Sequence, residues 1–461
     1  MTRHTRQPGG PRRPTARSKG TRGRGVFRST TQTARQRATV EIEHVGREGD
    51  GLGREVGAPD GSRGKTVAIP FTLPGERVDA QLVGERGRAL RIEQPAGARR
   101  EPLCTHHGRA SEVDPACGAC ALQHWTPEPY RAWKRELLVR ALQRAGIDAE
   151  VDPLVASEPG TRRRLVLAAR RTEAGVVLGF NAHRTDRIVD MRECPVALPV
   201  IVDALPTLRD LLREALAPGA RAKVSVLATE TGLDVAIEGD GVAEVVAARF
   251  GQGSIVRVSA NGEVLHERAA PVLRFGATAI TPPPGAFVQA VAMAEDAMAS
   301  LVCEHLRGAR RVADLFCGSG AFALRLAQRS AVHAVETFAA PLAALDRAWR
   351  GGEGLRTVTI ERRDLERRPL QPAELEGRDG PRSKPYDGLV FDPPRAGAEA
   401  QCEALARAHV PRVAAVSCNP QTLARDLAIL VGGGYRIERL VPIDQFLFTP
   451  HLEVVALLSR D

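Results

Sequence analysis

Long apolar runs are missing from this chain of 461 residues. No uninterrupted hydrophobic stretch reaches the ~18 residues that a membrane-spanning helix needs, so we expect a protein without a membrane partner. The first residues, 1–4, have no apolar segment behind them, which argues against a secretory signal. We therefore expect a cytoplasmic protein whose eight cysteines stay reduced rather than pairing in disulfides.

Acidic residues are missing from residues 1–40, which contain ten Arg and one Lys. The rest of the chain has 54 basic and 55 acidic residues, so the net charge of +10 is a property of this segment. Its Gly, Pro, Ser and Thr content predicts a disordered basic tail over residues 1–38. Two interpretations stay open: an arm that binds polyanions non-specifically, or a solubilising extension without a binding role.

The length predicts two or three domains, and 43% hydrophobic residues suffice for their cores. Short strand patterns at 39–43, 65–69 and 76–83, with four glycines between 46 and 53, predict a small β-barrel over residues 39–95. A barrel of the oligonucleotide-binding sort fits this spacing, and any other small barrel is the alternative.

Residues 96–285 predict a central α+β domain, because helix patterns at 127–146 and 205–216 alternate with hairpins at 165–180 and 224–237. From residue 286 onward, strands and helices alternate. Helix 288–306 is followed by strands at 311–316, 331–335, 387–391, 412–416 and 451–458. We therefore expect an α/β protein whose C-terminal domain, 286–461, is Rossmann-like with a doubly wound, mostly parallel sheet.

A glycine-rich turn, Gly318-Ser319-Gly320, links the first of these strands to a helix and would admit a nucleotide-like cofactor close to the backbone. Glu336 lies sixteen residues past Gly320 at the end of the next strand, where it could accept both ribose hydroxyls. Asp364 lies where a further strand would end and could meet the adenine. The alternatives are a surface carboxylate at Glu336 and an exposed ion pair at Asp364.

Two tight turns follow buried strands further along the chain. In Asp392-Pro393-Pro394-Arg395, the prolines make a rigid turn that would hold Asp392 at the sheet edge, facing the cofactor and a target base. A stiff loop without a binding role is the alternative. Ser417-Cys418-Asn419-Pro420 places a cysteine at the end of the next strand, where ligands bind in open α/β sheets.

A cysteine beside a nucleoside-bearing cofactor indicates methylation of a pyrimidine carbon. A thiolate that adds to C6 of uracil makes C5 nucleophilic, and a general base must later remove the C5 proton. Cys418 is the candidate nucleophile, and Glu453, an isolated acid in an apolar strand, is the candidate base. The alternatives are a cysteine that acts as a small buried hydrophobe and a half-exposed strand acid.

A second group of cysteines lies in the first half of the chain: Cys104, Cys117, Cys120 and Cys194. The Cys-x2-Cys spacing of Cys117 and Cys120 fits one metal centre, to which the other two could contribute. Zinc and an iron–sulfur cluster are both compatible with four thiolates. Unrelated buried cysteines are the alternative.

With these motifs, residues 39–461 resemble the uracil-C5 RNA methyltransferases, which use S-adenosylmethionine on ribosomal or transfer RNA. The resemblance implies a TRAM barrel at 39–95, a cysteine-bearing central domain at 96–285 and a catalytic methyltransferase domain at 286–461. It also implies that the four cysteines are ligands of a [4Fe–4S] cluster, since the run Cys117-Gly-Ala-Cys120-Ala-Leu-Gln-His124 is close to the family's pattern.

The resemblance further implies the roles of single residues. Cys418, Asp392 and Glu453 match the catalytic positions. Cofactor positions are matched by Gln289 in Phe287-Val288-Gln289, by Phe316 in the first cofactor motif, by Glu336, Asp364 and Asp392, and by Ala321, where many members have Asn or Thr.

We thus expect a monomeric enzyme that methylates C5 of a uridine in RNA, with 23S rRNA favoured over tRNA. One alternative is an RNA-binding assembly factor on a methyltransferase scaffold that no longer turns over. Another is DNA cytosine-C5 methylation, although its nucleophile normally lies in a Pro-Cys loop soon after the cofactor motifs.

Overall fold

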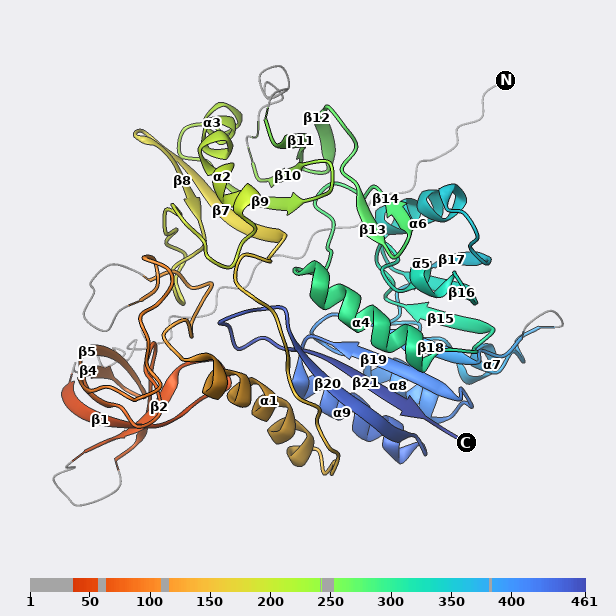
Figure 1. Cartoon of the computed structure of the whole chain (residues 1–461), viewed down its shortest axis with the longest axis horizontal. Helices are drawn as coiled ribbons and strands as arrows, with labels where there is room; N and C mark the ends of the chain where they lie inside the picture. Colours follow the sequence, from red (N-terminus) through yellow and green to blue (C-terminus); the bar gives the residue numbers. More distant parts are fainter. Residues whose placement is uncertain (1–35, 57–63, 109–115, 241, 243–252, 381–383) are drawn as a thin grey trace, which may run out of the picture.

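The computed structural model describes residues 36–56, 64–108, 116–240, 242, 253–380 and 384–461. The predicted basic tail, 1–38, therefore lies almost entirely outside the described residues. The described chain forms a barrel, a central sheet and a large C-terminal sheet, which follow one another in sequence except for one short strand of the last sheet (Figure 1).

The N-terminal strands close into a barrel in the order β1-β2-β3-β5-β4. Their bounds are β1 Gln36–Val45, β2 Gly51–Glu55, β3 Thr66–Ile69, β4 Arg77–Val83 and β5 Arg86–Gln94. Alternate residues such as Val40 and Ile42 fill the interior. Gly53 permits the close pairing of β2 with β1, because a Cβ there would lie 2.2 Å from the Glu41 carbonyl oxygen. The predicted barrel fold is confirmed, with β5 as a strand that the sequence patterns had not separated.

The central sheet has six strands in the order β12-β11-β10-β9-β7-β8. They are β7 Arg164–Thr172, β8 Gly175–Gly179, β9 Arg221–Ala228, β10 Leu233–Glu238, β11 Ile255–Ala260 and β12 Glu263–Glu267. The helices α2, Pro199–Asp203, and α3, Leu205–Ala215, share one hydrophobic core with this sheet. Both expected hairpins are present, whereas β11 and β12 were not predicted.

The C-terminal sheet has eight strands in the order β17-β16-β15-β18-β19-β21-β20-β6. The first five in that order run parallel: β17 Val358–Arg362, β16 Ala331–Glu336, β15 Arg311–Leu315, β18 Gly388–Phe391 and β19 Arg412–Ser417. The remaining strands are β21 Glu453–Ser459, which is antiparallel to both its neighbours, β20 Arg436–Asp444 and the short β6 Val155–Ala156.

Helices cover both faces of this sheet, so the expected doubly wound architecture is confirmed. One core contains α4 Ala292–His305, α5 Ala323–Leu326 and α6 Ala339–Gly351. The other contains α1 Pro127–Arg144, α7 Pro372–Leu375, α8 Glu399–Ala406 and α9 Pro420–Gly432. A short antiparallel pair, β13 Leu273–Phe275 and β14 Thr278–Ile280, precedes α4.

Some element bounds differ from the sequence patterns. α4 begins at Ala292 rather than 288, and α5, the helix expected after the glycine-rich turn, is a single turn. Both α1 and β6 come from residues before 286, yet they pack on the C-terminal sheet.

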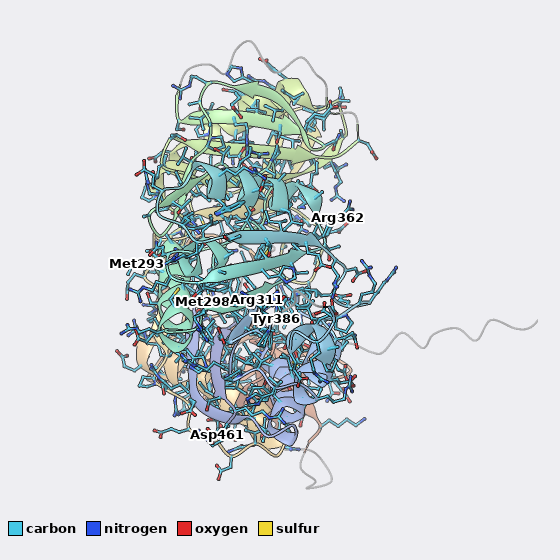
Figure 2. The ribbon with its side chains drawn as sticks, turned by 90° about the vertical axis from the view of Figure 1, so that its right-hand side faces the viewer. Met293, Met298, Arg311, Arg362, Tyr386 and Asp461 are labelled. Atoms are coloured by element: carbon cyan, nitrogen blue, oxygen red, sulfur yellow. The ribbon has the colours of Figure 1, made fainter. Side chains whose placement is uncertain are left out.

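At the amino edge of the sheet, the Arg311 guanidinium lies 4.1 Å from the ring centre of Tyr386 (Figure 2).

Within the described ranges, no helix is long and apolar enough to cross a membrane.

A buried ion pair fastens α1 to the end of β20. Lys134 is 0% exposed, and its Nζ lies 2.6 Å from Oδ1 of Asp444. The Tyr130 hydroxyl donates to the other oxygen of the same carboxylate at 2.7 Å. Lys134 also donates to the carbonyl oxygens of Phe446 and His451, so it holds both ends of the loop between β20 and β21.

Replacing Lys134 with Met should lower the free energy of unfolding by about 3–5 kcal/mol, because Asp444 would keep a buried charge without its cation. Urea unfolding followed by circular dichroism would measure the loss. Arg140→Ala, which removes an exposed ion pair on the same helix, is the control and should cost less than about 1 kcal/mol. Equal stability of the two variants would contradict a stabilising role for the buried pair.

Candidate active site

Strand order brings three sequence-predicted residues to one edge of the C-terminal sheet. Asp392 directly follows β18 and Cys418 directly follows β19, and these parallel neighbours end side by side. Glu453 begins β21, which runs antiparallel to β19 and pairs its Val454 with Ser417. The start of β21 therefore meets the ends of β18 and β19, although up to 61 residues separate Asp392 from Glu453 in sequence.

The two tight turns are bonded to each other. The Asn419 side-chain amide donates to the Arg395 carbonyl oxygen at 3.1 Å, and the Thr422 hydroxyl donates to the same oxygen at 3.2 Å. The Asn419 side-chain oxygen also accepts from the Gln421 backbone N–H, which caps α9 at its start. The Asp-Pro-Pro-Arg and Ser-Cys-Asn-Pro turns thus form one unit around Cys418.

Cys418 is half-buried and faces negative charge. Burial is the main cause that raises the pKa of its thiol to about 11; the carboxylates of Glu453 and Asp392 contribute to this increase, and Arg395 opposes it. The protein without RNA therefore holds a thiol at neutral pH. Arg395 is the cation in this site that favours the thiolate, a contribution that the sequence alone did not assign.

Glu453 is 2% exposed, which rules out the half-exposed strand acid as its environment. Its Oε1 accepts from the Gln445 side-chain amide at 2.9 Å, and its buried Oε2 has no hydrogen-bond partner. Burial raises the pKa of the Glu453 carboxyl to about 8, with Asp392 adding to the shift and Gln445 opposing it. A carboxylate with this pKa and a free oxygen can accept a proton near neutral pH.

Asp392 is bonded to the candidate cofactor residue Gln289. The Gln289 amide donates to Asp392 Oδ2 at 3.0 Å. Burial raises the pKa of the Asp392 carboxyl to about 7, and this hydrogen bond moderates the increase. The site thus has two carboxyl groups that titrate in the same range and repel each other when both are ionised.

The glycine-rich turn follows β15, as predicted. Phe316 adopts a left-handed conformation with φ of 58°, which is uncommon for a non-glycine residue and typical of functional turns. Gly320 also has positive φ, and a Cβ there would lie 2.5 Å from Leu345. Ala321 follows the turn and is partly buried against the core of α4 to α6.

Glu336 ends β16 and holds this turn. Its Oε2 accepts the Gly318 backbone N–H at 3.1 Å, and its Oε1 accepts those of Thr337 and Phe338. Asp364 lies two residues beyond β17, is partly exposed and pairs with Arg367. The turn and both carboxylates therefore lie at the same sheet edge as Cys418. Asp364 nevertheless forms an ion pair with Arg367, which was the alternative interpretation of this residue.

The sequence patterns missed Gln445, Lys134 and Asp444. Gln445 is 1% exposed and connects Glu453 to Gln289, to which it donates at 2.6 Å. The available signal was the polar pair Asp444-Gln445 ahead of the apolar Phe446-Leu447-Phe448. Without knowledge of the strand order, that pair could not be connected to Glu453.

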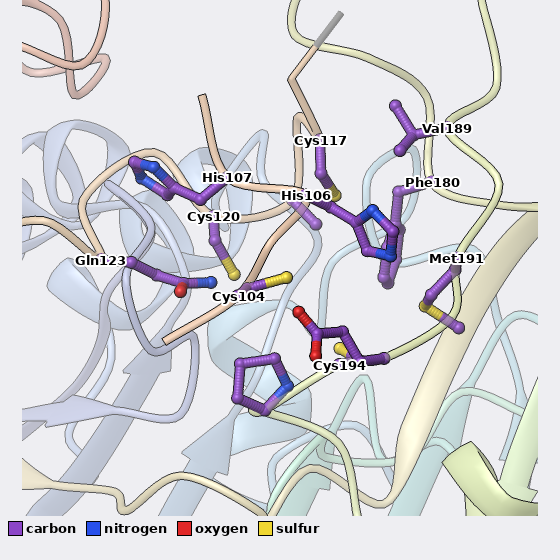
Figure 3. Close-up of a pocket in the computed structure, with 13 residues that line it drawn as sticks. Cys104, His106, His107, Cys117, Cys120, Gln123, Phe180, Val189, Met191 and Cys194 are labelled. Atoms are coloured by element: carbon purple, nitrogen blue, oxygen red, sulfur yellow. The ribbon is translucent and has the colours of Figure 1, made fainter. Parts of the chain in front are cut away.

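The four cysteines of the first half line one cavity (Figure 3). Their sulfur atoms turn toward its interior from Cys104, from the pair Cys117 and Cys120, and from Cys194. Burial raises the pKa of Cys104 to about 12 and that of Cys117 to about 11. Over the described part of the chain, however, no three or more His, Cys, Asp or Glu side chains are already grouped closely enough to hold a metal ion.

The cysteine cavity borders the loop between β20 and β21. Phe448, with φ of 62°, packs against Cys120 and Val196. The Leu122 backbone N–H donates to the Phe448 carbonyl oxygen at 3.0 Å. The segment that carries Cys120 therefore contacts the loop that leads into Glu453.

Known protein families match two parts of the chain, and relatives match nearly all of it. Residues 31–84 match the TRAM domain, and residues 370–461 match the family described as tRNA (uracil-5-)-methyltransferase. A 23S rRNA (uracil(1939)-C(5))-methyltransferase, RlmD, of Chromohalobacter salexigens is 34% identical over 98% of this chain and 95% of its own. The chain belongs to the RNA (uracil-5-)-methyltransferase family. An uncharacterized RNA methyltransferase of Brucella suis is 49% identical over 93% of this chain and 99% of its own.

A solved structure shares the fold of this RNA methyltransferase. It is the Pyrococcus abyssi tRNA (uracil-54, C5)-methyltransferase in complex with S-adenosyl-L-homocysteine. The TM-score is 0.67 at 23% identity, over 92% of this chain and all of that one. Asp392, Cys418 and Glu453 all lie inside the matched segment 370–461.

The carboxylates around Cys418 predict a pH-dependent thiol reactivity. At pH 9.5, where Glu453 is ionised, Glu453→Gln should speed alkylation of Cys418 by iodoacetamide by about tenfold, the effect of one pKa unit. At pH 7 the two proteins should react more nearly alike, because Glu453 with a pKa of about 8 is already largely protonated. Peptide mass spectrometry would separate Cys418 from the other cysteines. Glu438→Gln, on the exposed side of β20, is the control, and a Glu453 effect of equal size at both pH values would contradict this electrostatic account.

Proposed function

We propose that this enzyme methylates C5 of a uridine in RNA, with S-adenosylmethionine as the methyl donor, through a covalent bond between Cys418 and C6. The observation that carries the proposal is the convergence of Cys418, Asp392 and Glu453 beside the glycine-rich turn. RNA is the partner, and the N-terminal barrel and central sheet would grip it. The monomeric state and the cytoplasmic location stay predictions.

The scheme starts from the Cys418 thiolate, after the thiol has lost its proton to water. The Cys418 thiolate adds to C6, and the electron pair that moves to C5 takes the methyl group from the sulfonium of the donor. Glu453 Oε2 then accepts the C5 proton, and the electrons of that bond re-form the C5–C6 double bond as Cys418 leaves. Asp392 orients the base and the cofactor.

The cofactor would lie along the carboxyl edge of β15, β16 and β17. Backbone groups of the Gly318–Gly320 turn would face it, with Phe316 and Ala321 on either side. Glu336 would accept the ribose hydroxyls and Asp364 would meet the adenine, while Gln289 and Asp392 would approach the methionine portion. The donor's electrophilic methyl group is the chemistry that this cofactor supplies.

We further propose 23S rRNA rather than tRNA as the substrate. Support comes from the 34% identity to a 23S rRNA methyltransferase over nearly the whole of both chains. The structural likeness to a tRNA methyltransferase, at 23% identity, carries the fold and not the substrate. In either RNA the target uridine must leave its stack to reach Cys418, which costs a few kcal/mol and favours a loop or junction.

We also propose that Cys104, Cys117, Cys120 and Cys194 hold a [4Fe–4S] cluster. Four thiols that face one cavity suit a soft metal centre. Burial keeps these thiols protonated, and binding of the metal would displace their protons. The cluster would then connect Cys104, Cys117 and Cys120 to Cys194, next to the loop that precedes Glu453.

Methyl transfer from labelled S-adenosylmethionine into RNA of cells that lack this protein tests the function. The wild type should label large-subunit rRNA at 5-methyluridine, and Cys418→Ala should reduce the rate ~10³-fold or more because the nucleophile is lost. Glu453→Gln should accumulate a covalent RNA–protein adduct. Label in tRNA would overturn the substrate, and RNA binding without label would favour the assembly factor.

Anaerobic reconstitution tests the cysteine site. The protein should take up about four iron and four sulfide per chain, with visible absorbance. Cys120→Ser should prevent this uptake, whereas Cys402→Ser, a buried cysteine on α8, should leave it unchanged. Zinc without sulfide in the wild type would instead support the zinc alternative.

A further inference from the structure

We propose that Gln445 is a positioning residue of methyl transfer, whose side-chain amide orients the Glu453 carboxylate and the Gln289 amide together. This inference rests on the proposed function, in which Glu453 removes the C5 proton. It goes further by assigning a role to a residue outside the cofactor turn and the two tight turns.

A single backbone N–H determines how the Gln445 amide lies. The Ala290 N–H lies 2.8 Å from Gln445 Oε1, and a backbone N–H can only donate. The oxygen of Gln445 must therefore face Ala290, and its NH2 group faces the opposite way. That group lies 2.9 Å from Glu453 Oε1 and 2.6 Å from Gln289 Oε1, so it donates to both.

The orientation of the Gln445 amide also determines the orientation of the Gln289 amide. Because Gln289 Oε1 accepts from Gln445, the Gln289 NH2 group faces Asp392 and donates to it at 3.0 Å. The result is a continuous buried chain, Glu453–Gln445–Gln289–Asp392, with a carboxyl group at each end. Gln445 and Gln289 are 1% and 6% exposed, so water does not replace these bonds at low cost.

This chain distinguishes the two oxygens of the candidate base. Glu453 Oε1 is held by Gln445, whereas Oε2 is buried and has no partner. Oε2 is thus the oxygen left to take the C5 proton. Loss of the Gln445 donor would leave both oxygens without a bond and free the carboxyl group to rotate.

Three charged groups, Asp392, Arg395 and Lys134, act on the same carboxyl group. Burial and Asp392 disfavour its ionised form, and Arg395 and Lys134 favour it. His451, two residues away, has a pKa of about 4 because of burial and is neutral at working pH. Gln445 adds a neutral donor that favours the ionised form, so its removal should shift the titration of Glu453 to higher pH.

The first test follows single-turnover methylation by the full-length protein from pH 6.5 to 9.5. Gln445→Met has similar length but no donor. It should form the covalent RNA adduct at a near wild-type rate and resolve it about ten- to a hundredfold more slowly at neutral pH. This deficit should shrink as pH rises, with the acidic limb displaced upward by about one pH unit. Gln445→His, which keeps an N–H at a similar reach, should resolve the adduct faster than Gln445→Met.

A matched control is available in α8. Gln401 is also 1% exposed, and its side-chain amide accepts from the Leu370 backbone N–H and donates to the Leu370 carbonyl oxygen, with no hydrogen bond to Glu453. Gln401→Met should lower stability without moving the pH profile. A Gln445→Met deficit that is independent of pH, or that precedes adduct formation, would overturn the proposal. Failure of the wild type to form any adduct would instead count against the proposed function.

The second test needs neither RNA nor a Gln445→Met protein that folds. The wild-type protein is labelled with ¹⁵N-glutamine, and the Gln445 side-chain NMR signal is assigned through its absence in Gln445→His. This signal should shift with pH, with a midpoint near the Glu453 pKa of about 8. Glu453→Gln should abolish that shift. A Gln445 signal that does not respond to pH in the wild type would overturn the proposal.

Discussion

The buried contact between Lys134 and Asp444 is the constraint on which the candidate active site depends. Asp444 ends β20, and Lys134 also binds the carbonyl oxygens at positions 446 and 451, so the loop before Glu453 is held at three points. Because an unpaired charge in this interior would be costly, α1 must pack where it does. The helix that follows the cysteine segment is thereby tied to the strand that supplies the candidate base.

Electrostatics at the sheet edge keep the Cys418 thiol protonated near neutral pH. Three acidic groups, Asp392, Glu453 and the Cys418 thiol, share one partly dehydrated space, and each raises the cost of ionising the others. Arg395 and the Gln445 amide oppose this effect.

Much of the fold and the candidate site could be predicted from local sequence. Apolar runs that end in Asp392 and Ser417 predict buried parallel strands, and the turns after them place polar groups at a common edge whatever the strand order. The closed barrel, the doubly wound sheet and the family itself also followed from such patterns. The bounds of α4 and α5 could not be predicted in this way. Gln289 and the Gly318–Gly320 turn form hydrogen bonds with residues distant in sequence instead of the hydrogen bonds of a helix.

The sequence by itself determined which residues could do the chemistry, because residue type and a position at a strand end are local properties. Only the tertiary structure decided which of them act together. The antiparallel insertion of β21 beside β19 brings Glu453 to Cys418, and the single Ala290 N–H sets the order of the Gln445 and Gln289 amides. These are contacts between segments up to about 160 residues apart, and long-range pairing has no signature in any one stretch of sequence.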